Sequence, residues 1–388
     1  MNNVLASPAS VAEACFRNAM VVTPDDAFLG SVQVRRGCIV AIDRGPSAVG
    51  EDLEGDVLMP GVIDLHTDNL EKHFFPRPNI DWSPVSAAVT HDGCCLSVGV
   101  TTVFDSLSIG SFNAAASRNH DNLIRLADGL ASARAAGMLK ADHRLHWRCE
   151  TPADDLPDRL EALVGHPMTG LLSLMDHTPG QRQYRNLERY LANWAEQGMS
   201  SEAMDERMAG IRDRQTRNAD RNRRLVAELA IARGHPLASH DDEDVEHIDL
   251  AADLGATVAE FPVTLEAARR AHERGMVVVM GGPNLIRGGS YSGNVPAADL
   301  AHAGLLDAFA SDYVPRSLVE CAIKLTAPTF GWSLAQAVST VTSAPARAAQ
   351  LHDRGAIAPG LRADLLRVRI HDGLPMLRGV WVEGARAG

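Results

Sequence analysis

The chain has 388 residues, of which 45% are hydrophobic and 22% charged, and its formal net charge at pH 7 is −12. This acidic balance argues against a general nucleic-acid binder, whose surface is basic, although a local arginine cluster could still bind a small anionic substrate. No apolar run reaches the roughly 20 residues that a membrane-spanning helix needs. The N-terminus lacks the basic start and apolar core of a signal peptide. We therefore expect a cytoplasmic protein that binds neither nucleic acid nor membrane.

Both ends of the chain contain short runs of alternating apolar and polar residues, separated by Gly-rich turns. Residues 18–58 and residues 355–384 each show several such runs. This pattern is typical of short β-strands. Because two β-rich ends flank a long middle, we expect them to pair into one small β-sandwich domain, formed by residues 1–59 and 346–388.

The middle of the chain, residues 60–345, has a different rhythm. Apolar, strand-like runs recur and alternate with segments of helical periodicity, which predicts parallel βα units. Eight such units are the number in a (β/α)8 TIM barrel, the fold that we predict for this part. The eight runs cover residues 61–68, 99–108, 143–150, 170–178, 235–243, 256–264, 275–284 and 306–315.

One segment of the barrel, at about residues 181–224, is dense in arginine and much longer than a usual βα connection. We expect it to form a helical insertion over the mouth of the barrel. Two interpretations remain open for this insertion. It is either a charged, solvent-exposed helix pair or a lid that touches the substrate.

Ionisable side chains stand where the predicted barrel strands end, which is where the catalytic groups of such barrels project. His66 and Asp68 are two residues apart, so both point to the same face of a strand. With four further residues they place three imidazoles and three carboxylates at one mouth, a ligand set for one or two divalent ions such as Zn, Mn or Mg. Such ions lower the pKa of a water and so supply a nucleophile at neutral pH. The expected ligands are His66, Asp68, Glu150, His177, His240 and Asp312, with Asp176 as the alternative to its neighbour His177.

Three segments of the chain resemble the amidohydrolase superfamily: MPGVIDLHTDN (59–69), ASDY (310–313) and SAPARAAQL…RGAIAPGLRADLL (343–366). The resemblance covers nearly the whole chain and implies a metal-dependent hydrolase on a (β/α)8 barrel with a β-sandwich built from both ends. It implies that Asp312 is the general base and that Glu150 replaces the bridging carboxylated lysine of many members. The usual His-x-His motif reads His66-x-Asp68 here, and the added oxygen ligand favours Mn or Mg over Zn.

Two longer blocks, HTDNLEKH (66–73) and DHTPGQRQ (176–183), resemble one branch of this superfamily more narrowly. That branch acts in the carbon–phosphorus lyase pathway of phosphonate breakdown. The resemblance implies hydrolysis of the α–β phosphoanhydride of a ribosyl phosphonate 5-triphosphate, with release of pyrophosphate. The partner of the protein would then be a small, highly anionic substrate.

A substrate of this kind needs cations and backbone N–H donors, and the segment GGPNLIRGGSYSGN (281–294) offers both. Glycines let backbone amides approach oxyanions closely, and arginine binds phosphate oxygens in a fork. A plain flexible loop is the alternative interpretation of this segment. The residues expected to bind substrate are Lys72, His73, Arg77, Arg182, Asn284, Arg287, Ser290, Ser292 and Asn294.

Two other functions stay open at this point. An amide hydrolase of the same superfamily, such as an N-acetyl-sugar deacetylase or a cyclic-amide hydrolase, would need few cations near the metals, whereas this sequence has several. A catalytically inactive scaffold would have lost metal ligands, and none is missing. Members of the superfamily often form dimers or tetramers, so a homo-oligomer is compatible with the resemblance, but no motif predicts one.

Overall fold

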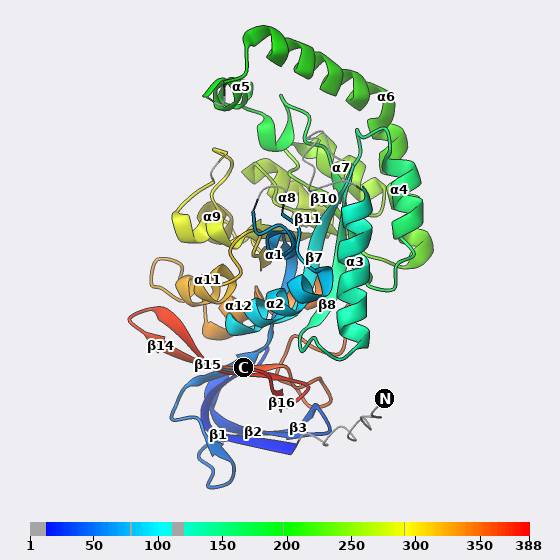
Figure 1. The fold of residues 1–388 in the computed structure, drawn as a ribbon. Coiled ribbons are helices and arrows are strands. Elements are labelled where there is room, and N and C mark those ends of the chain that lie inside the picture. The colour runs from blue at the N-terminus through cyan, green and yellow to red at the C-terminus, as the bar shows by residue number, and fades with distance from the viewer. Residues whose placement is uncertain (1–12, 78–79, 111–119, 197, 291) are drawn as a thin grey trace, which may run out of the picture.

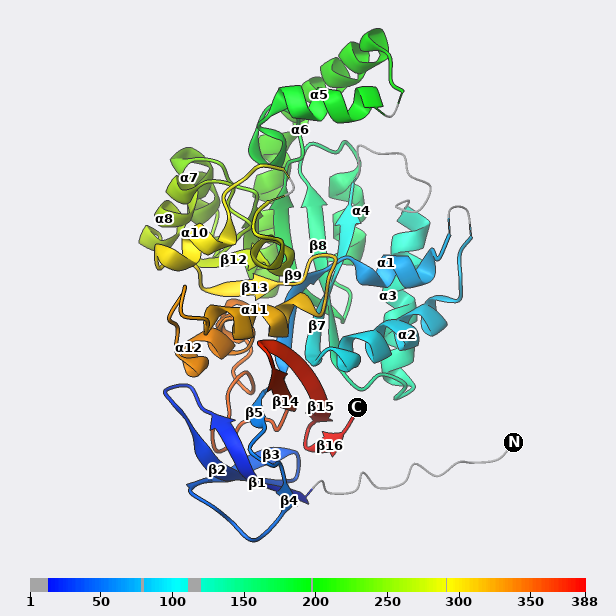
Figure 2. The ribbon, with the colours of Figure 1, turned by 90° about the vertical axis from the view of Figure 1, so that its left-hand side faces the viewer.

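The computed structural model describes residues 13–77, 80–110, 120–196, 198–290 and 292–388. Residues 1–12 of the expected β domain lie outside these ranges. Within the described residues, the strands form two eight-stranded sheets, one wholly parallel and one built from both ends of the chain. Figures 1 and 2 show them one above the other, with the end-built sheet at the bottom.

The parallel sheet is the predicted barrel, and one strand falls in each of the eight predicted runs. Its strands follow one another in chain order, and a parallel bridge between Thr67 and Asp312 joins the last strand to the first. The strands are β6 (Val62–Thr67), β7 (Val100–Ile109), β8 (Asp142–Glu150), β9 (Thr169–Met175), β10 (Leu237–His240), β11 (Val258–Glu260), β12 (Val277–Gly281) and β13 (Ala308–Ala310).

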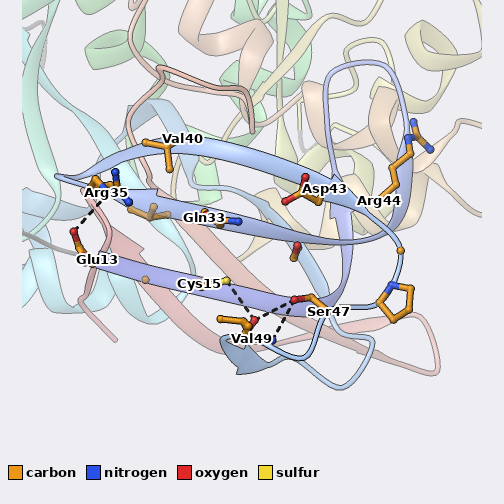
Figure 3. A pocket seen from close by; sticks show the side chains of 14 residues that line it. Glu13, Cys15, Gln33, Arg35, Val40, Asp43, Arg44, Ser47 and Val49 are labelled. Carbon is orange, nitrogen blue, oxygen red and sulfur yellow. Dashed lines mark hydrogen bonds and ion pairs between the residues drawn. The ribbon is translucent and has the colours of Figure 1, made fainter.

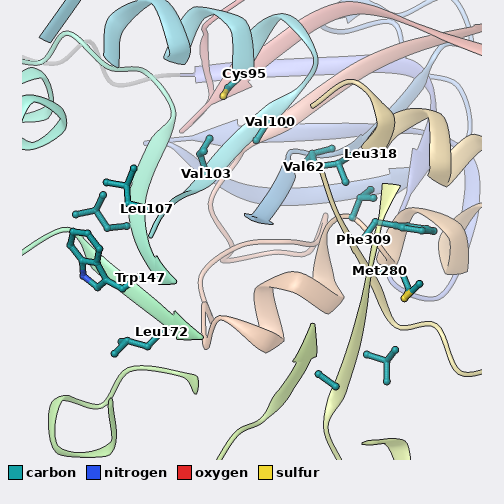
Figure 4. Packing of buried hydrophobic residues seen from close by; sticks show 14 of the residues in the cluster. Val62, Cys95, Val100, Val103, Leu107, Trp147, Leu172, Met280, Phe309 and Leu318 are labelled. Atoms are coloured by element: carbon teal, nitrogen blue, oxygen red, sulfur yellow. The ribbon is translucent and has the colours of Figure 1, made fainter. Parts of the chain in front are cut away.

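Successive residues of the barrel strands enter two different hydrophobic clusters. Val62 and Val103 belong to the cluster between strands and helices, whereas their neighbours Ile63 and Phe104 belong to a second cluster. Because side chains alternate between the faces of a strand, the second cluster fills the barrel interior. Figure 4 shows part of the first cluster, including the fully buried Trp147.

The second sheet is the predicted small β domain, and both chain ends contribute to it. Its strands have the order β16-β15-β14-β5-β1-β2-β3, with β4 paired to β1, so they form one continuous sheet around a shared core. The rings of Phe16 and Trp381 meet in that core at a centroid distance of 4.7 Å. The strands are β1 (Glu13–Val22), β2 (Ala27–Arg35), β3 (Cys38–Arg44), β4 (Glu51–Asp52), β5 (Val57–Pro60), β14 (Leu365–His371), β15 (Leu374–Val382) and β16 (Ala385–Arg386).

Helices surround the barrel. They are α1 (Asn69–Phe74), α2 (Pro84–Ser97), α3 (His120–Ala135), α4 (Leu156–Leu163), α7 (Val245–Asp253), α8 (Leu265–Glu273), α9 (Gly282–Arg287), α10 (Ala297–His302), α11 (Ser317–Leu325), α12 (Leu334–Ser339) and α13 (Ser343–Ala348). Among the described residues, no helix combines the length and apolar character that crossing a membrane would require.

The arginine-rich insertion is helical. A short 3-10 turn (Arg182–Tyr184) leads into α5 (Leu187–Glu196) and the 33-residue α6 (Ser201–Arg233). The side chain of Ser200 caps the start of α6, and Gly234 ends it in the left-handed conformation. In Figures 1 and 2, α5 and the first half of α6 project from the end of the barrel opposite the β domain.

Candidate metal centre and active site

Three strands of the barrel are followed, within two residues, by a non-glycine residue in the left-handed region of backbone space. Asp241, Phe261 and Asp312 have φ values of 54°, 56° and 54°, and all three line one cavity at the mouth. Such conformations cost energy for residues with a side chain and cluster at functional sites. The left-handed turn ends each strand and presents its side chain to the mouth.

The ends of β6 and β13 bring a first candidate ligand group together. One ligand atom from each of His66, Asp68 and Asp312 lies within 4.8 Å of the others. The backbone N–H of Asp312 donates to the carbonyl of His66 at 2.8 Å, and that of Asp68 donates to the carbonyl of Asp312 at 3.0 Å. These two bonds hold the ends of the first and last strands in register. Burial raises the pKa of Asp312.

A second candidate group lies at the ends of β9 and β10. It contains His177, His240 and Asp241, again with ligand atoms within 4.8 Å of one another. Nε2 of His240 is 3.1 Å from Oδ2 of Asp241, and Nε2 of His177 is 3.9 Å from the same oxygen. Glu150 adjoins this group, because its Oε1 accepts a hydrogen bond from Nδ1 of His177 at 2.5 Å.

Glu260, at the end of β11, connects the two groups. Its two oxygens accept hydrogen bonds from Nδ1 of His66 at 2.8 Å and from Nδ1 of His240 at 2.7 Å. Each imidazole thereby keeps its Nε2 for its own ligand group. Burial opposes a charge on both rings, but Glu260 raises the pKa of His66 to about 9, and Asp241 with Glu260 raises that of His240 to about 10.

The hydrogen bonds of these groups do not satisfy every buried carboxylate oxygen, and a divalent ion would do so. Within the described part of the chain, Oε2 of Glu150 is buried and accepts no hydrogen bond. A buried carboxylate oxygen without a partner is costly, and a cation would satisfy it. A further His/carboxylate grouping does not fit an ion. It includes His146, whose Nδ1 donates to the carbonyl of Leu65 and whose Nε2 accepts from Ser173.

All six predicted ligands therefore lie at one mouth, and the sequence interpretation missed two of their neighbours. Both residues, Asp241 and Glu260, are polar and lie at the ends of predicted strands. That position in the sequence is the signal that could have identified them. His177, and not Asp176, faces the ligand group. Asp176 instead binds Arg223 of α6 at 2.9 Å.

The sequence interpretation also missed Arg148, two residues before Glu150 on β8. Its side chain is largely buried, and its Nη1 donates to Oδ1 of Asp68 at 2.7 Å. Burial opposes its charge, but the Asp68 and Glu150 carboxylates raise the pKa of the guanidinium further above its usual value. A permanent positive charge thus stands among the acidic candidate ligands.

A cavity of about 370 Å³ opens beside the two ligand groups. Asp241 and Asp312 line it, and so does Tyr313, whose hydroxyl accepts a hydrogen bond from Arg287 at 3.1 Å. All five residues of segment 281–294 that were expected to bind substrate also line it: Asn284, Arg287, Ser290, Ser292 and Asn294. The first two belong to α9, so this part of the expected loop is helical, and the other three lie on the loop after it.

The other four residues expected to bind substrate do not line this cavity. Lys72 lies close by, with its ammonium 2.9 Å from Oδ1 of Asn69 and 3.5 Å from the carbonyl of Tyr313. The ring of His73 lies 5.6 Å from that of His91, and Arg77 is exposed.

Arg182, the fourth of them, is buried. Its guanidinium binds Asp242 at 2.5 Å and the carbonyl of His240 at 2.9 Å. It therefore supports the strand end that carries His240.

A second cavity, of about 550 Å³, lies on the β domain at the other end of the molecule. Figure 3 shows its lining, which includes the ion pair of Glu13 with Arg35 and the hydrogen bonds of Cys15 and Ser47 with the Val49 segment. Its lining residues include none of the candidate ligand groups. The candidate ligand groups therefore adjoin the cavity at the barrel mouth and not this second cavity.

A (β/α)8 barrel with histidine and carboxylate ligands at its mouth, joined to a β domain from both chain ends, defines a class of metal-dependent hydrolases. The Amidohydrolase family matches residues 219–386. The chain is also 41% identical over 376 residues to the alpha-D-ribose 1-methylphosphonate 5-triphosphate diphosphatase of Escherichia coli strain K12, covering 95% of this chain and 98% of that protein. The chain belongs to the amidohydrolase family, which confirms the relationship expected from its motifs.

Solved structures share the fold at low sequence identity. The 5-methylcytosine deaminase of Klebsiella pneumoniae, liganded with phosphonocytosine, matches with a TM-score of 0.64 and 14% identity, over 96% of this chain and 97% of that one. The N-acetylglucosamine-6-phosphate deacetylase of Pasteurella multocida matches with a TM-score of 0.64 and 13% identity, over 97% and 99%. These similarities support the architecture alone.

Proposed function

We propose that this chain hydrolyses the α–β phosphoanhydride of a ribosyl phosphonate 5-triphosphate and releases pyrophosphate, in phosphonate catabolism. The observation that carries the proposal is that the two candidate ligand groups adjoin one cavity, whose other wall is formed by α9 and the loop of anion donors after it. The 41% identical relative, a diphosphatase for such a substrate, supports it.

The cofactor that we propose is one or two divalent ions, either Zn, Mn or Mg. His66, Asp68 and Asp312 would hold one ion, and His177, His240 and Asp241 the other. Glu150, with its partnerless oxygen, could ligate as well. Both groups contain carboxylate ligands as well as histidines, and oxygen ligands favour Mn or Mg over Zn. When bound, such an ion lowers the pKa of a water and offsets phosphate charge.

Asp312 is the residue that we assign as general base. Its carboxylate lines the cavity, and burial raises its pKa, which makes it a stronger base at neutral pH. The oxygen of a water would bond to the α-phosphorus while the bond from that phosphorus to the bridging oxygen breaks. The electron pair of the broken bond leaves with pyrophosphate, and a proton of the water passes to Asp312.

Phosphate oxygens would meet Arg287, Ser290, Ser292 and Asn294 along the cavity. Asn284 has a different role there, because its amide is already used on both sides. Its Nδ2 donates to the carbonyl of Val295 at 3.1 Å, and its Oδ1 accepts from the N–H of Ala297 at 2.9 Å. We therefore assign Asn284 to shaping the loop and Lys72, outside the cavity, to the remaining anionic part of the substrate.

The test is pyrophosphate release by protein reconstituted with Zn, Mn or Mg in parallel. Ribose 5-triphosphate and nucleoside triphosphates are the substrates, and an acetylated amino sugar is the control. Pyrophosphate together with a 5-monophosphate is the expected result and establishes α–β cleavage. Release of orthophosphate alone would place cleavage at the β–γ link. Amide cleavage without pyrophosphate would replace the proposal with a deacetylase.

The cytoplasmic location stays a prediction from the sequence, and a homo-oligomer stays compatible with the resemblance without being predicted by any motif.

A further inference from the structure

The first residues of the insertion touch the candidate site. Arg182 binds the carbonyl of His240, and the next residue, Gln183, lines the cavity beside Asp241 and Asp312. The ring of Tyr184 follows, at 6.1 Å from that of His177. This stretch is therefore a wall of the active site and not a surface appendage.

The helix that follows, α5, continues this wall. Tyr190 of α5 packs on Tyr184 at a centroid distance of 5.1 Å. Arg189 reaches the loop after β12, because its Nη1 lies 3.5 Å from the place that a Cβ on Gly293 would occupy. Gly293 lies between Ser292 and Asn294, which both line the cavity. A second guanidinium is thus placed against the anion-donor loop, in addition to that of Arg287.

The charges around the cavity are divided. Its acidic lining residues, Asp241 and Asp312, both belong to the candidate ligand groups. Arg287 lies at the end of α9, and Ser290, Ser292 and Asn294 lie on the loop after it. A triphosphate whose α-phosphorus is beside Asp312 would therefore extend its β- and γ-phosphates toward the loop. Arginine binds such oxygens with charge-assisted hydrogen bonds.

We propose that Gln183 and Arg189 of the insertion complete a subsite for the two phosphates that leave as pyrophosphate. This inference rests on the proposed function and extends it, because it makes the insertion responsible for selecting substrates that carry a polyphosphate chain. We expect a single phosphate beside Asp312 to depend less on Arg189, because Arg189 lies against Gly293. The insertion thus sets which phosphate esters bind well.

The experiment measures binding of inorganic pyrophosphate and of orthophosphate to the metal-loaded, full-length protein by isothermal titration calorimetry. Arg189→Gln should raise the Kd for pyrophosphate by at least about tenfold, the size of one charge-assisted hydrogen bond. The Kd for orthophosphate should change less than about twofold. Gln183→Glu, which adds a negative charge to the cavity wall, should also weaken pyrophosphate binding.

Arg217→Gln is the matched control, because Arg217 is an exposed arginine of α6 that pairs with Asp154 and Asp213. Its pyrophosphate Kd should equal that of the wild type. Unchanged pyrophosphate binding in Arg189→Gln, or an equal loss for both anions, would overturn the inference even if the protein hydrolyses triphosphates. Selective loss of pyrophosphate binding in a protein without triphosphatase activity would uphold the subsite and reject the proposed function.

Discussion

Glu260 orients two histidines of the candidate site, although it does not line the cavity at the mouth. Its two oxygens bind Nδ1 of His66 and of His240, and it is 2% exposed. The two imidazole rings are stacked at a centroid distance of 5.7 Å as a result. A carboxylate that fixes the tautomer and direction of two candidate ligand histidines would act on metal affinity without touching the metal.

Replacing this carboxylate by an amide tests that role. Glu260→Gln keeps the shape but turns one acceptor into a donor, which cannot accept from an Nδ1–H. We expect metal affinity to fall by about 10- to 100-fold. Competition with a chromophoric chelator measures it directly. Glu266→Gln on the exposed start of α8 is the control and should bind metal normally; equal affinities in both variants would remove Glu260 from the site.

Asp312 combines two proposed roles, ligand and base, that one substitution can separate. Asp312→Asn retains an oxygen ligand but cannot accept a proton, so turnover should fall by about 10²- to 10⁴-fold while the metal content stays the same. Pyrophosphate release and elemental analysis on the same samples provide both values. Asp307→Asn serves as the control, since Asp307 lies just before β13, where it binds His272 and the N–H of Val278. Near-normal turnover in Asp312→Asn would exclude the base role.

At the scale of elements, α6 is anchored to the segment directly after Glu150. The side chain of Asn222 is fully buried and donates to the carbonyls of Thr151 and Ala153 at 2.8 and 3.0 Å. One helix turn earlier, Asn218 donates to the carbonyl of Pro152. The long helix therefore replaces the backbone partners that this irregular segment lacks, and it fixes the segment that follows a candidate ligand.

Removal of one anchor should loosen this segment. Asn222→Ala leaves two buried carbonyls without a donor, which should lower the free energy of unfolding by about 1–3 kcal/mol. Urea denaturation followed by circular dichroism measures the change. In Thr216→Ala, by contrast, only an exposed hydroxyl bond within α6 is lost, so the change should stay within about 0.5 kcal/mol. Similar values for the two variants would show that Asn222 is no anchor.

The elements were predictable where one physical rule decides them. Eight barrel strands were predicted from eight apolar runs that each end in polar residues. A strand that is buried on both faces must be apolar until it reaches the mouth of the barrel. Two β-rich ends around a long middle predicted that both ends pair into one small β-sandwich domain, and both ends do contribute strands to one sheet. The arginine content and length of residues 181–224 also predicted a helical insertion, and α5 and α6 confirm that it is helical.

Partners of individual side chains were less predictable. Arg182 forms an ion pair with Asp242, which lies 60 residues later, and no local sequence pattern predicts that pair. The same holds for Glu260, whose role depends on the positions of β6 and β10. The left-handed turns at Asp241 and Asp312 are set by tertiary contacts, since neither is a glycine. Sequence therefore placed residues at the mouth but could not assign which of them contact substrate, metal or one another.

At the scale of the whole molecule, a buried charge network ties the barrel wall to its helices. Asp105 of β7 accepts hydrogen bonds from Nε2 of His91 and from Nδ1 of His143, both at 2.8 Å, and Asp92 lies 3.3 Å from Nε2 of His143. All four side chains are buried. Both nitrogens of His143 therefore face carboxylates, which makes the network an internal ion pair and not a metal site.

This network predicts a window of pH in which it stabilises the fold. Burial opposes the charge on His143, but Asp105 outweighs it and raises the pKa from 6.5 to about 9, so this contribution is complete below pH 6.5 and is lost as the pH rises through 9. Burial also opposes the charge on Asp105, but His143 and His91 lower its pKa from 3.8 to about 2, so that contribution is lost as the pH falls through 2. Both act together between about pH 4 and 6.5.

Asp105→Asn should remove the ion pair, and urea unfolding between pH 3 and 9.5 measures the effect. The difference in unfolding free energy from the wild type should be largest near pH 5 and should shrink toward pH 9, because a neutral His143 no longer needs the carboxylate. His143→Gln should lose the same alkaline dependence, which guards against a variant that merely packs badly. Asp81→Asn breaks an exposed pair with Arg125 and should give a small difference at every pH. A difference for Asp105→Asn that is constant from pH 5 to 9 would mean that His143 is neutral in the folded protein, and the network would then be a set of neutral hydrogen bonds.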